Sequence, residues 1–307
     1  MSPATDQKVL NRNHIAIINQ GVDYIVDHLF EKLTVEMIAD HCCFSRHYYN
    51  RLFKSVTRES VYSFIKRVRI ETAACKLIKF SNLSITSIAA ELGYSSSNFS
   101  VMFKKHYNLS PSQFRLNPEL PLKSSSHSVL QRIQELQENK PVTLLQQMDK
   151  SIRFKELPDI KLVYKRFKGN YQNLAPVWQA FCTKMEHSFP DFPIEFYGIS
   201  YDDPLIAQEN KCLYDLCARV TDSVKVKGEN FRKIPGGLYL CCRFGDHVRK
   251  INQLYNDLFA VWMPHRGYTM GHGLCFERYF KESVPGGNVV MDLCIPVLSN
   301  NRAQIQK

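Results

Sequence analysis

Basic and amide side chains gather on one side of the segment that begins at Ser45. On a helix counted from Ser45, the apolar side holds Phe44, Tyr49, Leu52 and Phe53. The residues that face away from these anchors are Arg46, His47, Asn50, Arg51 and Lys54. Arginine can bind guanine with two hydrogen bonds, and asparagine can bind adenine in the same way. We therefore expect Asn50 and Arg51, with His47 beside them, to read bases; the alternative is an ordinary solvated helix face.

Phosphate contacts fix the register of a protein on DNA without reading its sequence. We expect Arg46 and Lys54 to make such contacts in this first segment. A second segment exposes Ser96, Ser97, Asn98, Ser100, Val101, Lys104 and Lys105. Its serines can form hydrogen bonds without a strong base preference, and they bind phosphates equally well. The first segment is therefore predicted to specify the DNA sequence, and the second mainly to position the protein.

A different chemistry is suggested by Glu277. Alternation along 273–280 places Cys275, Glu277 and Tyr279 on one face of a predicted strand. A partly buried carboxylate is costly unless a cation or hydrogen-bond donors accompany it. Aromatic rings add cation–π attraction. We expect a ligand site here, with a lipophilic cation as ligand; the alternative is an internal pair with an arginine. The other candidate aromatic residues are Trp178, Tyr197 and Trp262, and core packing is an equal explanation for the two tryptophans.

The elements that must position these residues occur twice. At an offset of 50 residues, Ile38-Ala39 matches Ile88-Ala89, and Phe53-Lys54 matches Phe103-Lys104. Each copy reads as a short helix, a tight turn and a second helix, which is a helix-turn-helix. A continuous helix predicted over 60–78 joins them. At 1.5 Å per residue this helix is about 28 Å long, near the roughly 34 Å of one DNA turn. A monomer could therefore reach two successive grooves of an asymmetric site.

The second half repeats at an offset of 77. Arg166-Phe167 matches Arg243-Phe244, and 215–217 matches 292–294. Each copy is predicted to be strand, helix, strand, strand, with strands at 160–167, 193–202, 211–220, 238–244, 273–280 and 289–297, and helices at 171–187 and 248–263. The fold class is therefore multidomain: an all-α double helix-turn-helix domain followed by an α+β domain of two such repeats.

Composition supports two domains and an anionic partner. The chain has 307 residues and a net charge of +11, and residues 43–120 hold 12 lysines and arginines against 4 acids. Such a balance favours nucleic acid. Prolines and serines after Arg115 suggest a linker. We expect a DNA-binding domain at 10–116, a linker at 117–149 with one short helix around 129–137, and a ligand-binding domain at 150–298.

Several classes of protein are disfavoured. No signal peptide, membrane span or phosphate-cradling loop is found in the sequence. The ten cysteines lack the spacing of a zinc site. We expect free thiols, those of Cys42-Cys43 and Cys241-Cys242 being buried, in a cytoplasmic protein with no metal, no cofactor and no catalytic residue.

Residues 14–115 resemble the DNA-binding domain of the AraC/XylS family of bacterial regulators. The resembling residues are Ile38-Ala39, Ile88-Ala89, Ser45–Lys54, Gly93-Tyr94, Phe99–Lys105 and Leu109–Arg115. Residues 150–298 resemble the GyrI-like effector-binding domain, on Phe276–Tyr279 and Asp292–Val297. The resemblance implies a transcription regulator that binds double-stranded promoter DNA, acts with RNA polymerase and senses a small molecule, with Glu277 in the ligand groove.

Two alternatives remain open. The second domain could bind a protein partner and no ligand. It could also be a GyrI-like hydrolase that uses Glu277 and Tyr279, although no third catalytic group is found.

Overall fold

The computed structural model describes residues 12–80, 83–118, 122, 127–139, 141–190, 193–219, 230–271, 273–281, 283 and 287–297. The chain divides into two compact units within one long helix. Of the described residues, the first unit holds 12–69 and Asn230, and the second holds the others. Each unit is described by itself.

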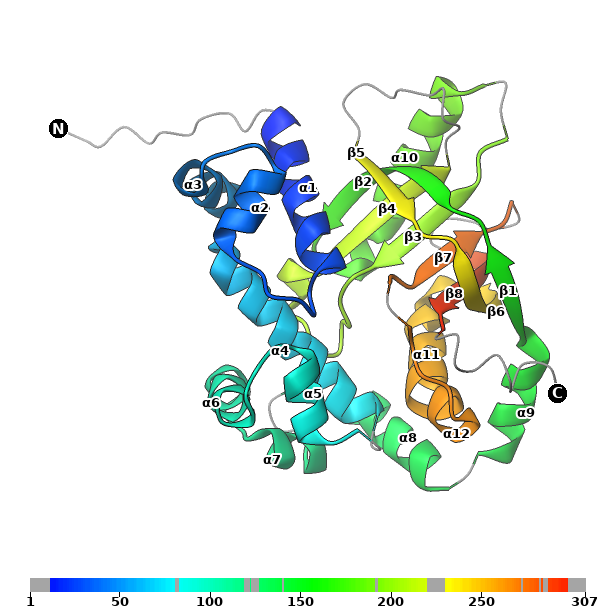
Figure 1. Cartoon of the computed structure of the whole chain (residues 1–307). Helices are drawn as coiled ribbons and strands as arrows, with labels where there is room; N and C mark the ends of the chain where they lie inside the picture. Colours follow the sequence, from blue (N-terminus) through cyan, green and yellow to red (C-terminus); the bar gives the residue numbers. More distant parts are fainter. Residues whose placement is uncertain are drawn as a thin grey trace. The chain divides into compact units, whose positions relative to one another are not determined.

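The first unit is the first helix-turn-helix with the helix before it. Its elements are α1 (Arg12–Asp27), α2 (Val35–His41), α3 (Arg46–Thr57) and the start of α4 (Val61–Lys79) (Figure 1). Helix α2 is capped by Thr34, whose side chain accepts the N–H of Met37 at 3.2 Å. The anchors predicted from the sequence are buried, since Tyr49 and Phe53 are inaccessible to solvent. Helix α3 therefore has one buried side and one exposed side.

The second helix-turn-helix repeats this construction in the second unit. It consists of α5 (Ile85–Glu91), α6 (Ser96–Tyr107) and the short α7 (Pro111–Leu116). Ser84 caps α5 as Thr34 caps α2, 50 residues earlier, and accepts the N–H of Ser87 at 2.9 Å. A hydrophobic cluster that includes Phe99, Phe103 and Phe114 holds these helices against the end of α4. The double helix-turn-helix predicted from the sequence is confirmed.

The turns of the two copies differ in one residue type. The backbone adopts a left-handed conformation at Cys43, with φ of 60°, and at the equivalent Gly93, with φ of 76°. Glycine adopts this conformation without strain, whereas a residue with a side chain does so at a cost of about 1 kcal/mol. Cys43 is exposed, so the expectation that both thiols of the Cys42-Cys43 pair are buried is wrong for Cys43. All ten cysteines lie in the described part of the chain, and none of them forms a disulfide bond.

The second half of the chain is a curled sheet of eight strands. Their order is β1-β6-β8-β7-β3-β4-β2-β5, and the pairs whose registers are resolved are antiparallel. The first repeat contains β2 (Ile160–Lys168), α10 (Leu174–Ser188), β3 (Phe196–Ser200) and β4 (Leu213–Arg219). The second contains β6 (Gly237–His247), α11 (Ile251–Asn256), a π-helical turn (Asp257–Trp262), α12 (Met263–Arg266), β7 (Phe276–Tyr279) and β8 (Asn288–Pro296). The predicted strand, helix, strand, strand repeat is confirmed.

Each repeat also has a first strand that the sequence did not reveal. These strands are β1 (Ile152–Leu157) and β5 (Asn230–Ile234), and they are exchanged between the copies: β1 pairs with β6 of the second repeat, and β5 lies beside β2 of the first. Each of these strands carries a basic residue at the same place in the repeat, since Lys155 and Arg232 are separated by the offset of 77. Strand exchange therefore ties the two repeats into one sheet.

The segment 117–149 differs from the expected linker with a single short helix. It contains α8 (His127–Glu138) and most of α9 (Val142–Ser151). Ile133, Leu145 and Met148 are buried in the same core as α11 and β8. Prolines and serines made the segment look like a linker, although the spacing of its apolar residues is helical. No helix in the described part of the chain is long and apolar enough to cross a membrane.

Candidate nucleic-acid interface and effector site

The exposed side of α3 carries most of the side chains predicted to contact DNA. Arg46, His47, Arg51 and Lys54 are exposed. The guanidinium of Arg51 lies over the ring of Tyr48, 5.7 Å from its centroid. Arg46 pairs with Glu36, but both side chains are about half-exposed, and such pairs contribute little to stability. These four residues therefore form one accessible basic surface.

Asn50 has a different task from the one expected. Its Oδ1 accepts the backbone N–H of Val61, the first residue of α4, at 3.1 Å. A helix leaves its first N–H groups without partners, and a side-chain acceptor stabilises it. Bidentate binding of adenine needs both the oxygen and the nitrogen of the amide. Because this oxygen already accepts one hydrogen bond, the structure favours Asn50 as a helix cap over Asn50 as a base reader.

The second helix-turn-helix shows why this cap occurs only once. At the offset of 50, Val61 corresponds to Pro111, which has no N–H, and Asn50 corresponds to Ser100. Ser100 instead donates to the carbonyl of Ser96 at 2.9 Å. The asparagine is present where there is an N–H to bind and absent where there is none.

We expect Asn50→Ala to destabilise the first helix-turn-helix by about 1 kcal/mol, because the cap of α4 is lost. Ser100→Ala, at the equivalent position, should change stability by less than about 0.5 kcal/mol. Hydrogen exchange at the amide of Val61 measures the effect directly. Asn50→Asp keeps the acceptor and should restore protection. Unchanged exchange in Asn50→Ala would show that the cap contributes nothing.

Helix α6 presents the second predicted surface. Ser96, Ser97, Asn98, Val101, Lys104 and Lys105 are exposed, and Ser100 is half-buried. Ser95 caps the helix by accepting the N–H of Asn98 at 3.4 Å. The only cations in this set, Lys104 and Lys105, lie in the last turn.

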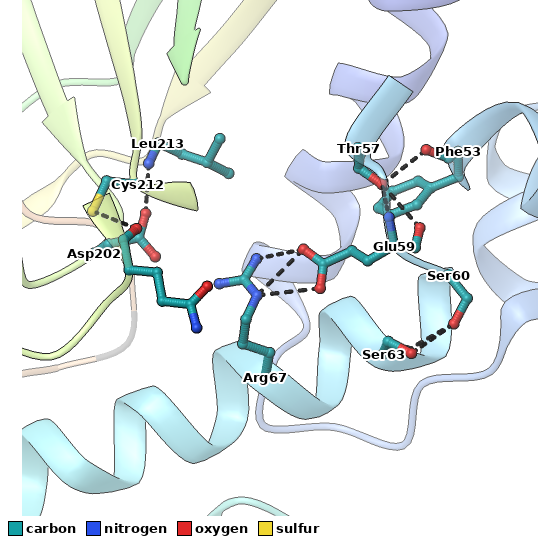
Figure 2. Close-up of polar contacts among 10 residues, drawn as sticks. Phe53, Thr57, Glu59, Ser60, Ser63, Arg67, Asp202, Cys212 and Leu213 are labelled. Atoms are coloured by element: carbon teal, nitrogen blue, oxygen red, sulfur yellow. Dashed lines mark hydrogen bonds and ion pairs between the residues drawn. The ribbon is translucent and has the colours of Figure 1, made fainter. Parts of the chain in front are cut away.

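Some of the basic residues counted in the sequence serve the fold. Arg67 is buried and binds the carboxylate of Glu59, with its Nη2 2.9 Å from Oε1 (Figure 2). Arg69 donates to the carbonyl of Leu29 at 2.9 Å, and Arg115 to that of Leu83 at 2.7 Å. The charge count therefore overstates the basic surface that is free to meet DNA.

In the sheet domain, Glu277 is the centre of a cluster of tyrosines. Glu277 is 2% exposed. It accepts hydrogen bonds from the hydroxyls of Tyr214, of Tyr279 at 2.7 Å and of Tyr255 at 3.1 Å. Among the described residues, no lysine or arginine forms an ion pair with it, so the alternative of an internal arginine partner is not supported. Burial raises the pKa of Glu277 above its ordinary value, while the tyrosine hydroxyls act in the opposite direction.

A set of half-buried aromatic rings surrounds this carboxylate. Trp178 of α10 lies edge-on to Tyr279 and Tyr214, with ring centroids 5.3 and 6.1 Å apart. At the offset of 77, Trp178 corresponds to Tyr255 of α11. Each repeat therefore contributes one aromatic side chain from its helix to the same site. We missed Tyr214 and Tyr255 in the sequence, although the repeat relation to Trp178 could have identified Tyr255.

Gly198 leaves the room that this cluster needs. It lies opposite Glu277 in the β3–β7 ladder. A Cβ atom at Gly198 would lie 1.8 Å from the Tyr214 hydroxyl and 2.5 Å from the Glu277 carboxylate. The glycine is therefore required by the close approach of the two polar groups.

The structure does not bring the other two predicted ligand residues to this site. Tyr197 is on the opposite face of β3, where its ring packs against Phe276 and its hydroxyl binds Glu195 at 2.6 Å. Trp262 is buried; its Nε1 donates to Asp149 of α9 at 2.8 Å and its ring stacks on Tyr268. Tyr197 and Trp262 thus pack the core, and the candidate site consists of Glu277, Tyr279 and Trp178 with Tyr214 and Tyr255. Among the described residues, no group of side chains suited to a metal ion is found.

The fold and the two surfaces define a DNA-binding regulator with a small-molecule-binding domain, and comparison with known proteins identifies its family. Residues 38–117 match a helix-turn-helix domain, and residues 150–298 match the GyrI-like small molecule binding domain. The regulatory protein SoxS of Salmonella typhimurium is 30% identical over 104 residues, which are 34% of this chain and 96% of SoxS. The transcriptional regulator AlkR of Acinetobacter baylyi is 40% identical over 83 residues, which are 27% of each chain.

The chain belongs to the AraC family of transcription regulators, with a GyrI-like domain after the helix-turn-helix region. The resemblance inferred from the residues is thereby confirmed. The relatives named here are transcription regulators, not enzymes. Among solved structures, the EcmrR–DNA complex matches 80% of this chain and 98% of its own chain, with a TM-score of 0.39 and 15% identity.

Proposed function

We propose that this regulator reads promoter DNA with α3, holds the duplex with α6 and responds to a lipophilic cation bound at Glu277. In this proposal residues 10–116 are the DNA-binding domain, 117–149 the connection and 150–298 the effector domain. A regulator bound at a promoter acts on RNA polymerase, which is the proposed protein partner, in the bacterial cytoplasm.

One observation supports the effector assignment above the others. The Glu277 carboxylate is buried among hydroxyl groups and half-buried aromatic rings, without a cationic partner among the described residues. Burying an ionised carboxylate is costly, and a cation at this site would offset that cost. The rings of Trp178, Tyr255 and Tyr279 would add cation–π attraction. A lipophilic cation satisfies both features, whereas an anion would face a carboxylate.

The DNA-binding assignment divides labour between the helices. Arg51 is the proposed base reader, with His47 beside it. The proposed phosphate contacts are Arg46, Lys54, Lys104 and Lys105. The α6 side chains of Ser96, Ser97, Asn98 and Ser100 are proposed to lie near the sugar-phosphate backbone of the DNA. Backbone contacts supply affinity that depends on salt, while base contacts supply discrimination.

We expect Arg51→Ala to lose about 1–3 kcal/mol on a duplex selected by the wild-type protein from a random library, and much less on an unrelated duplex. Lys104→Ala should weaken both duplexes similarly and lower the salt slope by about 1. Fluorescence anisotropy at several salt concentrations measures both quantities. Equal losses for Arg51→Ala on the two duplexes would contradict its role as a base reader.

A further inference from the structure

Helix α4 ends against the GyrI-like domain, within the second compact unit. In its last turn, Nζ of Lys79 lies 2.5 Å from Oδ2 of Asp203, and each side chain is 11% exposed. Asp203 belongs to the loop between β3 and β4. Leu205 and Ile206 of the same loop lie in the hydrophobic cluster that contains Ala74 and Leu77 of α4. The helix shared by both helix-turn-helix copies is thus held by a loop of the effector domain.

The loop is in turn connected to the Glu277 site. Its turn is fixed by Asp203, whose Oδ1 accepts the N–H of Leu205 at 2.9 Å. The neighbouring Asp202 accepts the N–H of Leu213 at 2.6 Å (Figure 2). Leu213 also accepts the hydroxyl of Tyr171 at 2.7 Å. The next residue, Tyr214, packs against the ring of Tyr171 and donates to Glu277. A displacement of Tyr214 therefore reaches the loop through its immediate neighbours.

A second line of contacts reaches the same end of α4. Tyr255, which donates to Glu277, stacks on Phe259 with centroids 6.2 Å apart. Phe259 packs edge-on against Phe80, and Nζ of Lys79 lies 5.9 Å from its ring centroid. Phe259 is part of the π-helical turn, a type of distortion that is common at functional sites.

Helix α8 ties this turn to α4 as well. The side-chain amide of Gln137 donates to the carbonyl of Ala260 at 3.0 Å and to that of Ile78 at 3.4 Å. The π-helical turn and the last turn of α4 therefore share one side chain as a hydrogen-bond donor.

We propose that Tyr214 and Tyr255 transmit the state of the Glu277 site to the last turn of α4, by two routes that converge on Lys79. The inference rests on the proposed effector site. A cation that binds Glu277 competes with the tyrosine hydroxyls for the carboxylate oxygens, so the two tyrosines adopt different positions in the free and bound states. A ligand shifts an equilibrium only when it interacts differently with the two states, and this competition supplies the difference. The consequence is a change in the stability of the α4 end, which supports the second helix-turn-helix.

The routes can be tested without any ligand by a double-mutant cycle read by hydrogen exchange. The reporter is the amide of Phe80, which bonds to the carbonyl of Lys76 at 3.0 Å. Glu277→Gln perturbs the site, and Asp203→Asn/Phe259→Leu cuts both routes. The matched control is Asp246→Asn/Phe154→Leu, which alters an exposed ion pair and another ring of the same core. Tyr255→Phe, which removes a single hydroxyl, serves as a milder perturbation of the site.

We expect Glu277→Gln to change exchange at Phe80 about fivefold in the wild-type and control backgrounds. In the Asp203→Asn/Phe259→Leu background the change should be under about twofold. Two results would overturn the coupling. One is an equal change of exchange at Phe80 in all backgrounds. The other is no change in the wild type with either Glu277→Gln or Tyr255→Phe. The ligand class is tested separately by titration with tetraphenylphosphonium. If tetraphenylphosphonium does not bind but the double-mutant cycle is non-additive, the proposed cationic ligand is rejected and the coupling between the site and α4 is supported.

Discussion

Asp215→Asn should lower the free energy of unfolding of the effector domain by about 3–5 kcal/mol. Asp215 is fully buried and binds Arg166, itself 5% exposed, through Nε at 2.7 Å and Nη2 at 2.6 Å. Tyr201 donates to the same carboxylate at 2.5 Å. Removing the charge takes away the ion pair that Asp215 forms with a buried guanidinium, and this loss exceeds the value of the hydrogen bonds alone.

The internal repeat supplies the matched control. Asp292 corresponds to Asp215 and binds Arg243 and Lys155, whose side chains are 50% and 41% exposed. Cations in contact with water keep their hydration, so Asp292→Asn should cost only about 1.5 kcal/mol. Urea unfolding followed by the fluorescence of Trp178 and Trp262 compares the two variants. Equal losses would mean that burial of the partner does not set the cost.

Glu277→Gln should weaken the binding of tetraphenylphosphonium at least about 30-fold, because the amide cannot compensate a buried positive charge. Fluorescence of Trp178 in a Trp262→Phe background measures the affinity, since the ring of Trp178 lies 5.3 Å from that of Tyr279. Glu195→Gln is the control, as Glu195 pairs with Arg278 and Arg219 away from this site. It should leave the affinity within about twofold. A wild-type affinity in Glu277→Gln would remove the residue from the site.

The same residue sets a pH dependence. Burial raises the pKa of Glu277 above its ordinary value of 4.5, and the cation binds the ionised form. Affinity should therefore be full above the raised pKa and fall as the pH drops through it, with no such fall in Glu277→Gln. Without ligand the sign reverses for stability: a raised folded pKa favours the protonated fold, so this contribution is present below pH 4.5 and is lost as pH rises through the folded pKa.

Local patterns predicted much of this molecule because its elements are built from local signals. Anchors at helical spacing located α3 and α6, and alternation put Glu277 and Tyr279 on one face. The two internal repeats predicted the order of helices and strands, because the same pattern occurs in both copies of each repeat. Five side chains of α3 were expected to face DNA. Four of them, Arg46, His47, Arg51 and Lys54, are exposed as the helical period requires.

The failures share a physical cause, because each depends on a contact between distant segments. In the sequence Asn50 resembles a base reader, and only the fold shows that its side chain accepts the N–H of Val61. Strands β1 and β5 form because each pairs with a strand of the other repeat. The five or six residues of each strand do not by themselves indicate this pairing. Trp262 has the same residue type as Trp178, but the folding of α9 onto the core buries it against Asp149. Tyr214 reaches Glu277 only through the order of the strands.

The most direct test of the effector site compares two ions of the same shape and opposite charge. Tetraphenylphosphonium and tetraphenylborate are titrated separately against the Trp262→Phe protein, with Trp178 as the reporter. The net charge of +11 favours the anion over the whole surface, so a preference for the cation must come from the site itself. We expect saturable quenching by tetraphenylphosphonium and none by tetraphenylborate. Equal quenching by both ions, or by neither, would contradict a cation site at Glu277 and would favour a domain that binds a protein partner.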